Sequence, residues 1–224
     1  MPPRHHEVTR LEGFSDAVFG FALTLLVVSL EVPSNFEALK AQMQGFLGFA
    51  LMFAMVCWIW YEHNWFFRHT GLQDAWTAFL NSVLLFVVLF YVYPLKFLTA
   101  SLLNAWFGLG GSDAPQLANG NELLMLYSAG VVMIFGTFLL LYRHARSLSG
   151  SLSPADAVDM RFVARAHTIS ALLGLTSVSI AAIGYVAAWE PLSGIAGAIY
   201  FLMGPLHAWN GRQGARAKER VVGA

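Results

Sequence analysis

The stretch GFSDAVFGFALTLLVVSLEVP, residues 13–33, decides the fold class of this chain. It places Ser15 and Asp16 at the start of an apolar run, residues 17–30, that contains no Lys, Arg, Asp or Glu. One hydroxyl, that of Thr24, lies near the middle of the run. A helix needs about 20 residues to cross the roughly 30 Å of hydrocarbon in a bilayer. The run therefore predicts a transmembrane helix whose polar flanks lie near the lipid headgroups.

Six such uncharged runs follow one another along the 224 residues, with only short connections between most of them. With 57% hydrophobic and 12% charged residues, the chain has too few polar groups to cover the surface of a soluble protein. We expect an all-α membrane protein with six transmembrane helices in a single domain, residues 1–224. The six runs are residues 17–30, 42–61, 75–95, 123–142, 168–189 and 191–211.

The basic residues are divided unequally between the two sides that six spans would create. Of the 13 Lys and Arg residues, only Lys40 and Lys96 lie on the side opposite to the termini. Cytoplasmic loops of membrane proteins carry such an excess of Lys and Arg. The asymmetry predicts that both termini are cytoplasmic, with residues 1–12 as the N-terminal segment and residues 211–224 as a basic tail that contacts lipid headgroups. A nucleic-acid partner is not needed to explain this tail.

Local signals predict where several helices begin and end. The first helix should end near Val32, because the following proline disfavours a helical predecessor. YVYPLK, residues 91–96, predicts the aromatic and basic end of the third helix, and GLGGSDAPQLANGNE, residues 108–122, predicts a flexible external loop. SLSPADAVD, residues 151–159, predicts a helix that is capped by the serine before its proline. The small residues of 168–189 allow close helix packing in lipid.

Four residues of the first helix share one stripe on a helical wheel. The centre of that stripe lies about 130° from Asp16, so the acid and the stripe face different neighbours. The four residues are Phe21, Thr24, Leu25 and Val28. From periodicity alone, contact with lipid or packing inside the bundle explains the apolar members. A bond from the Thr24 hydroxyl to the carbonyl one turn back likewise explains the threonine.

Asp16 needs a partner, because an acid near a membrane end is costly unless partners or water satisfy it. Arg10 lies six residues earlier, about 240° around the helix, and we do not expect these two to pair within the helix. Donors at the same level on other helices are the better candidates. They are Trp60 and His63 near the end of the second helix and Asn81 near the start of the third.

The stretch RLEGFSDAVFGFALTLLV, residues 10–27, resembles the R-x-x-x-F-S-D signature that opens the first helix of the transmembrane protein 175 family of potassium channels. The signature positions are Arg10, Phe14, Ser15 and Asp16. The W-x-x-H from Trp60 to His63, and the LNS that contains Asn81 and precedes Pro94, resemble the second and third helices of that family. The likeness in motifs ends near Pro94, whereas the likeness in the number of spans covers the whole chain.

The resemblance implies a potassium-preferring, weakly selective cation channel of the bacterial inner membrane, and this sequence contains no TVGYG filter. Prokaryotic members assemble as homotetramers in which the first helices line the pore. The implied partners are therefore further copies of the chain, membrane lipids, and potassium with other monovalent cations. The resemblance assigns the apolar constriction to Phe21, Leu25 and Val28 and the potassium preference to Thr24. Aliphatic residues are usual at the position of Phe21, and we expect Leu25 to form the narrowest layer.

The polar motif residues are interpreted as structural. Four apolar side chains around an axis form a neck that water leaves, so the constriction needs no charge. The acid then acts as a latch that holds the pore helix at its tilt and does not touch the ion. The structural set is Arg10, Phe14, Ser15, Asp16, Trp60, His63 and Asn81. We expect no enzyme activity and no cofactor other than the permeant potassium ion.

A secondary transporter or another multispan membrane protein is the alternative. A transporter would need broken helices and intramembrane charge near the midplane, whereas the six runs contain no carboxylate, Lys or Arg. A membrane enzyme would need converging reactive groups, and a latch explains Asp16, Glu62 and His63 more simply. His63 and His69 are six residues apart, against the four-residue spacing of helical zinc pairs, so no metal site is expected.

Overall fold

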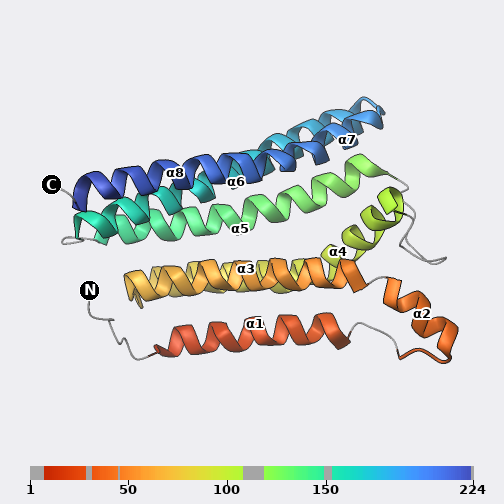
Figure 1. Cartoon of the computed structure of the whole chain (residues 1–224), viewed down its shortest axis with the longest axis horizontal. Coiled ribbons are helices and arrows are strands. Elements are labelled where there is room, and N and C mark those ends of the chain that lie inside the picture. Colours follow the sequence, from red (N-terminus) through yellow and green to blue (C-terminus); the bar gives the residue numbers. More distant parts are fainter. Residues whose placement is uncertain (1–7, 29–31, 45, 108–118, 149–152, 223–224) are drawn as a thin grey trace. The chain divides into compact units, whose positions relative to one another are not determined.

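The computed structural model describes residues 8–28, 32–44, 46–107, 119–148 and 153–222. Within these ranges every regular element is a helix, which confirms the all-α fold class (Figure 1). The helices are α1 (Arg10–Val28), α2 (Phe36–Gln44), α3 (Phe46–Thr70), α4 (Ala75–Phe107), α5 (Gly120–Leu148), α6 (Pro154–Val186), α7 (Pro191–Ala198), the 3₁₀ helix η1 (Ile199–Leu202) and α8 (Met203–Val222).

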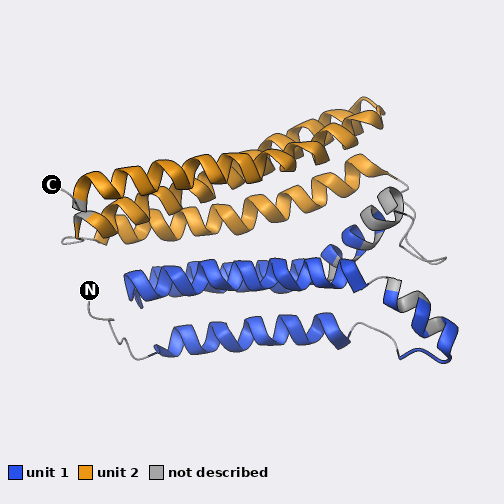
Figure 2. Ribbon diagram, in the orientation of Figure 1, with its two compact units in different colours: residues 1–118 blue, residues 119–224 orange. Residues whose placement is uncertain are grey.

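The chain divides into two compact units, residues 1–118 and residues 119–224 (Figure 2). The first contains α1 to α4 and the second contains α5 to α8. Each unit buries its own set of apolar side chains. That residues 1–224 act as one membrane domain remains a prediction.

In the first unit, α1, α3 and α4 pack against one another. Figure 1 shows α1 and α3 as antiparallel neighbours. The contacts among α1, α3 and α4 bury Phe19 and Leu26 of α1, Phe66 of α3 and Leu84 of α4, each of which is no more than 2% exposed. Burial of one face per helix, with the rest left open, is expected where lipid or another subunit covers the remainder.

The connection between α1 and α3 differs from the expected short turn. The described part of α1 ends at Val28, and Val32 is not helical. The predicted end near Val32 falls on residues 29–31, which lie outside the described chain, so it stays a prediction. A separate helix, α2, follows, with Phe36, Leu39 and Met43 recurring on one side of it. The polar composition of this segment concealed its helical periodicity.

The third predicted helix does not end at residues 91–96. Instead α4 continues through Pro94 to Phe107. Proline is tolerated inside membrane helices because neighbouring groups can satisfy the backbone that it leaves open, and the apolar residues after it prolong the helix. Figure 1 shows α4 changing direction along its length, as expected for a proline in its interior. Most of the predicted external loop, residues 108–118, lies outside the described chain.

In the second unit, α5 and α6 form an antiparallel pair that packs more extensively than any other two helices of the unit. Close approach is possible because Gly174 lies against Val132, where a Cβ atom would meet the valine side chain at 2.9 Å. Buried His167 of α6 stacks on Phe138 of α5 with 4.8 Å between ring centroids. The small residues of α6 thus allow the close packing that the sequence predicted.

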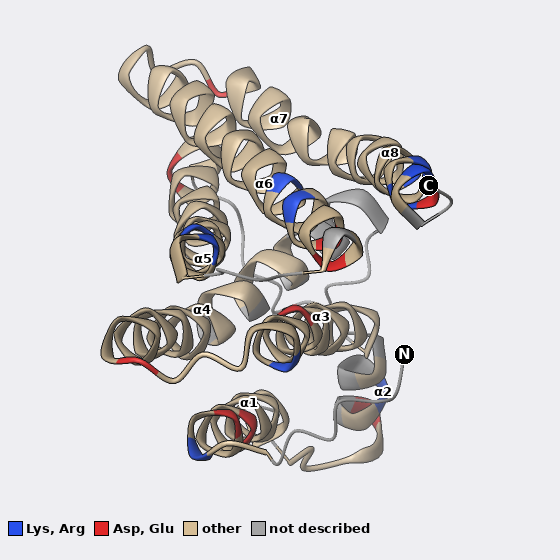
Figure 3. Cartoon of the chain, turned by 90° about the vertical axis from the view of Figure 1, so that its left-hand side faces the viewer, with Lys and Arg blue, Asp and Glu red and all other residues tan. Residues whose placement is uncertain are grey.

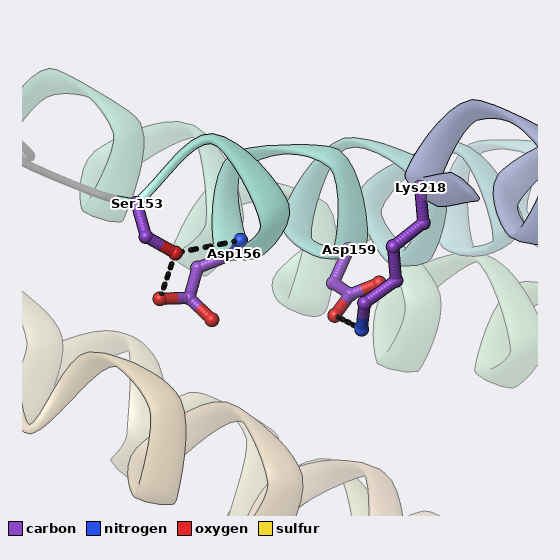
Figure 4. Close-up of polar contacts among 4 residues, drawn as sticks. All are labelled: Ser153, Asp156, Asp159 and Lys218. Atoms are coloured by element: carbon purple, nitrogen blue, oxygen red, sulfur yellow. Dashed lines mark hydrogen bonds and ion pairs between the residues drawn. The ribbon is translucent and has the colours of Figure 1, made fainter. Parts of the chain in front are cut away.

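The predicted start of α6 is confirmed. Ser153 is the N-cap, and its Oγ accepts a hydrogen bond from the Asp156 amide at 3.2 Å (Figure 4). Pro154 occupies the first turn, where its missing amide hydrogen has no cost. The Asp156 carboxylate also accepts from the Ser153 hydroxyl at 2.6 Å.

The sixth predicted span is not one continuous helix. Residues 191–211 are divided among α7, the 3₁₀ helix η1 and the first half of α8. Among the described residues, five helices are long and apolar enough to cross a membrane, namely α1, α3, the first part of α4, α5 and α6. Six spans therefore remain a prediction. The basic segment expected as a tail continues α8 as far as Val222.

Candidate pore-lining helix and its polar base

Helix α1 begins at a capping box that the sequence analysis did not single out. The Glu12 amide donates to the Thr9 hydroxyl at 3.1 Å, and the Thr9 amide donates to the Glu12 carboxylate at 2.8 Å. The T-x-x-E spacing is the signature of this arrangement and could have located the helix start. The box fixes where α1 begins.

One face of α1 packs against α3 and α4. Its buried residues are Ser15, Phe19, Ala22 and Leu26, which recur every three or four positions. On the helical wheel their centre lies about 140° from the centre of the predicted stripe. The stripe is therefore turned away from the other helices of its own unit.

The predicted stripe is exposed in the single chain. Phe21 is 67%, Leu25 46% and Val28 71% exposed. This exposure excludes packing against α3 and α4 of its own unit as the reason for the stripe. A second copy of the chain and the acyl chains of lipid are candidates to cover it.

Thr24 lies on the same exposed face, and its hydroxyl donates to the Gly20 carbonyl at 2.8 Å. This bond to the preceding turn is the local explanation that the sequence left open. A hydroxyl that donates its one hydrogen keeps two lone pairs on the oxygen. The bond therefore leaves the Thr24 oxygen able to accept or to approach a cation.

Asp16 has a partner on another helix. The Trp60 indole nitrogen donates to the Asp16 carboxylate at 2.7 Å. Trp60 was one of the three donors expected at this level of the membrane. Arg10 is exposed at the start of α1, and within the described chain no ion pair joins it to Asp16. Phe14, the remaining signature residue, is 59% exposed.

The other two expected partners are Asn81, which bonds to Ser15, and His63, which bonds to Asn81. Asn81 donates its side-chain amide to the Ser15 hydroxyl at 2.9 Å, and its carbonyl oxygen lies 2.8 Å from His63 Nε2. All three side chains are no more than 1% exposed. Asn81 is therefore an acceptor as well as a donor, and it ties α1, α3 and α4 together beneath the exposed face.

Glu62 and His69, two residues considered as metal ligands, each lie within hydrogen-bonding distance of a tryptophan on their own helix. Glu62 accepts from the Trp58 indole at 3.1 Å. His69 Nδ1 lies 2.7 Å from the Trp65 carbonyl. In the described ranges, no three His, Cys, Asp or Glu side chains come together as metal ligands would.

Comparison with known proteins identifies the family. The family model for the endosomal/lysosomal potassium channel TMEM175 matches residues 10–91. A potassium channel of Marivirga tractuosa is 35% identical over 229 residues, covering 98% of this chain and 92% of the relative. The chain belongs to the TMEM175 family. Because this is a family of potassium channels and not of enzymes, the enzyme alternative is excluded.

Solved TMEM175 structures have the same fold. The crystal structure of a threonine-to-alanine variant of the potassium channel MtTMEM175, in complex with a nanobody–MBP fusion, superposes with a TM-score of 0.81 at 35% identity, covering 95% of this chain and 96% of that one. A TMEM175 homologue from Chamaesiphon minutus superposes with a TM-score of 0.61 at 21% identity, covering 92% and 96% of the two chains. The second likeness concerns the fold alone.

The part of the chain that matches the TMEM175 family model contains the whole polar base, which is the set of bonded side chains of Ser15, Asp16, Trp60, His63 and Asn81. Residues 10–91 include α1, α2, α3 and the part of α4 that carries Asn81. They therefore include the exposed stripe of α1 and the side chains that hydrogen-bond to Asp16 and Ser15. A further potassium channel, from Chamaesiphon minutus, is 30% identical over 110 residues, covering 46% of this chain and 54% of the relative.

Proposed function

We propose that this TMEM175 protein is a homotetrameric, potassium-preferring and weakly selective cation channel whose pore is lined by four copies of α1. The observation that carries the proposal is the exposed stripe of α1, which its own unit leaves uncovered while the opposite face is packed. We further propose six spans, cytoplasmic termini and a location in the bacterial inner membrane. The unequal distribution of Lys and Arg supports this topology.

The constriction in this proposal is hydrophobic. Phe21, Leu25 and Val28 from four chains would form successive apolar rings around one axis, with Leu25 as the narrowest. Such a neck is closed when water leaves it and conducts when water fills it again. No charged residue lies between Ala17 and Val28 to hold an ion in place.

Potassium preference is assigned to Thr24. Four threonine oxygens at one level would replace part of the hydration shell of an ion that enters the neck. A single ring of hydroxyls offers few ligands compared with stacked rings of backbone carbonyls. This difference supports weak rather than strict selectivity.

The polar base positions α1 without touching the ion. Asp16 and Ser15 bond to Trp60 and Asn81 on neighbouring helices and lie away from the stripe. Rotation of α1 about its axis would break both bonds. We therefore assign to the base the role of fixing which face of α1 meets the axis.

A secondary transporter is the second candidate, favoured by the interruption of the sixth segment at η1. Discontinuous helices mark substrate sites in many transporters. Here, however, Tyr200 of η1 donates to Ser128, which lies 2.7 Å from Ser177, so hydroxyls bond to one another. Charged groups that could bind a coupled ion are absent from this described cluster.

Reconstitution of the purified chain into planar bilayers tests the proposed function. We expect unitary current steps, a reversal potential that favours potassium over sodium, and a tetrameric mass in detergent. A flux that saturates and requires a coupling ion would instead establish a transporter. A monomeric protein that conducts would contradict the assignment of α1 to a shared axis.

A further inference from the structure

The second half of α8 has one face that is fixed against α6. Asn210 donates to the Phe162 carbonyl at 2.8 Å, and Gly214 lies against the Phe162 ring, where a Cβ atom would meet it at 3.1 Å. One turn further on, Lys218 pairs with Asp159 of α6 (Figure 4). The contacting residues of α8 are four positions apart and form one stripe.

Three arginines form a second stripe on the opposite face of α8. Arg212, Arg216 and Arg220 each follow a contacting residue by two positions, which is about 200° around a helix. All three are exposed, and within the described chain none has a hydrogen bond or ion pair. Figure 3 shows the basic positions of α8 gathered near the C-terminus. We call these three residues the basic row.

The acidic neighbours of the basic row do not neutralise it. Asp159 on α6 is paired with Lys218, on the other side of α8. Glu219 lies at the edge of the row and offsets one of its three charges. The row therefore keeps a net positive charge of about two at neutral pH.

The basic row begins where the apolar part of α8 ends. Residues 203–211 contain no Lys, Arg, Asp or Glu and continue the sixth apolar run. Trp209 lies at the boundary, 47% exposed, with the Arg165 guanidinium 4.6 Å from the centre of its ring. Tryptophan next to arginine is typical of the level of lipid headgroups.

We propose that the basic row binds the headgroups of anionic phospholipids on the cytoplasmic surface. Guanidinium groups match phosphate oxygens in geometry and charge. Arg216 and Arg220 lie about 6 and 12 Å further along α8 than Arg212. Since exposed charges are screened over about 8 Å at physiological ionic strength, Arg212 contributes most and Arg220 least. The inference does not depend on conduction.

Lipid titration of the detergent-solubilised full-length protein tests the proposal. Native mass spectrometry gives the apparent dissociation constant for dioleoylphosphatidylglycerol, with dioleoylphosphatidylcholine as the zwitterionic comparison. The row variant carries Arg212→Gln, Arg216→Gln and Arg220→Gln. The control variant removes the same charge from exposed positions of α3 and α5 and carries Arg68→Gln, Arg143→Gln and Arg146→Gln.

We expect the row variant to bind phosphatidylglycerol at least roughly tenfold more weakly, because one arginine next to headgroups is worth about fivefold. The dissociation constant of the control variant for phosphatidylglycerol should change by less than about twofold. The binding of phosphatidylcholine should not change in either variant. Among the single variants, Arg212→Gln should lose the most affinity for phosphatidylglycerol and Arg220→Gln the least. Each of these results supports the proposal.

Three results would overturn it. Equal losses in the row and control variants would indicate a general charge effect. Competition by glycerol 3-phosphate at the concentration of the lipid would indicate a site for a small soluble anion. A row variant with a changed oligomeric mass would place the arginines at a contact between copies of the chain.

Discussion

Trp60 of α3 donates its indole hydrogen to the carboxylate of Asp16 on α1, 44 residues earlier in the chain, with 2.7 Å between the two atoms. The bond joins the helix proposed to line the pore to its neighbour at one level. An exposed carboxylate with a single neutral donor is held by geometry more than by charge. We therefore expect the bond to stabilise one rotation of α1 about its own axis.

We predict that Trp60 and Asp16 are energetically coupled. Trp60→Phe and Asp16→Ala should each lower the thermal stability of the assembled protein, and the double variant should lose no more than the worse single one. A coupling of about 1 kcal/mol is expected for a partly exposed bond to a charged group. Asp16→Ala should reduce the fraction of assembled protein before it alters ion preference. Additive losses, or a stable assembly with changed preference, would contradict this role.

Asn81 is predicted to be the most sensitive residue of the polar base. Asn81→Ala removes the donor to Ser15 and the acceptor for His63, both of which stay buried. Two buried groups without partners should cost about 2 to 4 kcal/mol of unfolding free energy. Ser82→Ala, at an exposed neighbour whose hydroxyl bonds only within its helix, is the matched control. Unfolding curves in detergent should shift for the first variant and not for the second.

Leu25→Ala should widen the neck. We expect the single-channel current in bilayers to rise roughly twofold or more, because a smaller side chain allows water to stay in the constriction. Val27→Ala is the control, since Val27 is also exposed, at 49%, but lies off the stripe. Unchanged conductance in the Leu25 variant, or an equal rise in both, would count against a pore lined by this face.

Substitution of Thr24 should change ion preference and not current alone. Thr24→Val keeps the shape but removes the oxygen, and the ratio of potassium to sodium permeability should fall to roughly one. Thr24→Ser keeps the hydroxyl and should preserve the preference. Reversal potentials under bi-ionic conditions measure both. A preserved ratio in the valine variant would assign selectivity elsewhere.

Gly184 is predicted to be a packing position of the second unit. A Cβ atom there would lie 2.4 Å from Asn121 Oδ1 and 2.8 Å from the Leu192 side chain. Gly184→Ala should therefore lower the stability by about 1 to 3 kcal/mol. Gly136→Ala in α5 is the control, because nothing lies within 4 Å of its added methyl group. Equal melting temperatures for the two variants would contradict the close approach.

The sequence placed Phe21, Leu25 and Val28 on one side of α1, because their spacing fixes a common side once a helix is assumed. It left open whether that side is exposed or packed inside the bundle. It also predicted Trp60, His63 and Asn81 as polar groups at the level of Asp16. It could not choose among them, since the rotation of α3 and α4 decides which donor reaches the acid. That rotation results from packing between residues far apart in the chain.

The interruption of the sixth segment was not predictable from hydropathy. Residues 191–211 form one uncharged run, and a window of this length does not reveal a change from α to 3₁₀ hydrogen bonding. The hydroxyl of Tyr200 in η1 donates to Ser128 of α5, a contact between distant residues that hydropathy does not reveal. In contrast, the start of α6 was predictable because cap and proline act within one turn.

Pro94 sets a limit on how far α4 can follow the bilayer normal. A straight helix of 33 residues would measure about 50 Å, well beyond the hydrocarbon thickness. The 18 residues Ala75–Val92 of α4 are by themselves long and apolar enough to span. The bend thus resolves a hydrophobic mismatch, because the surplus length can turn toward the membrane plane without thickening the surrounding lipid.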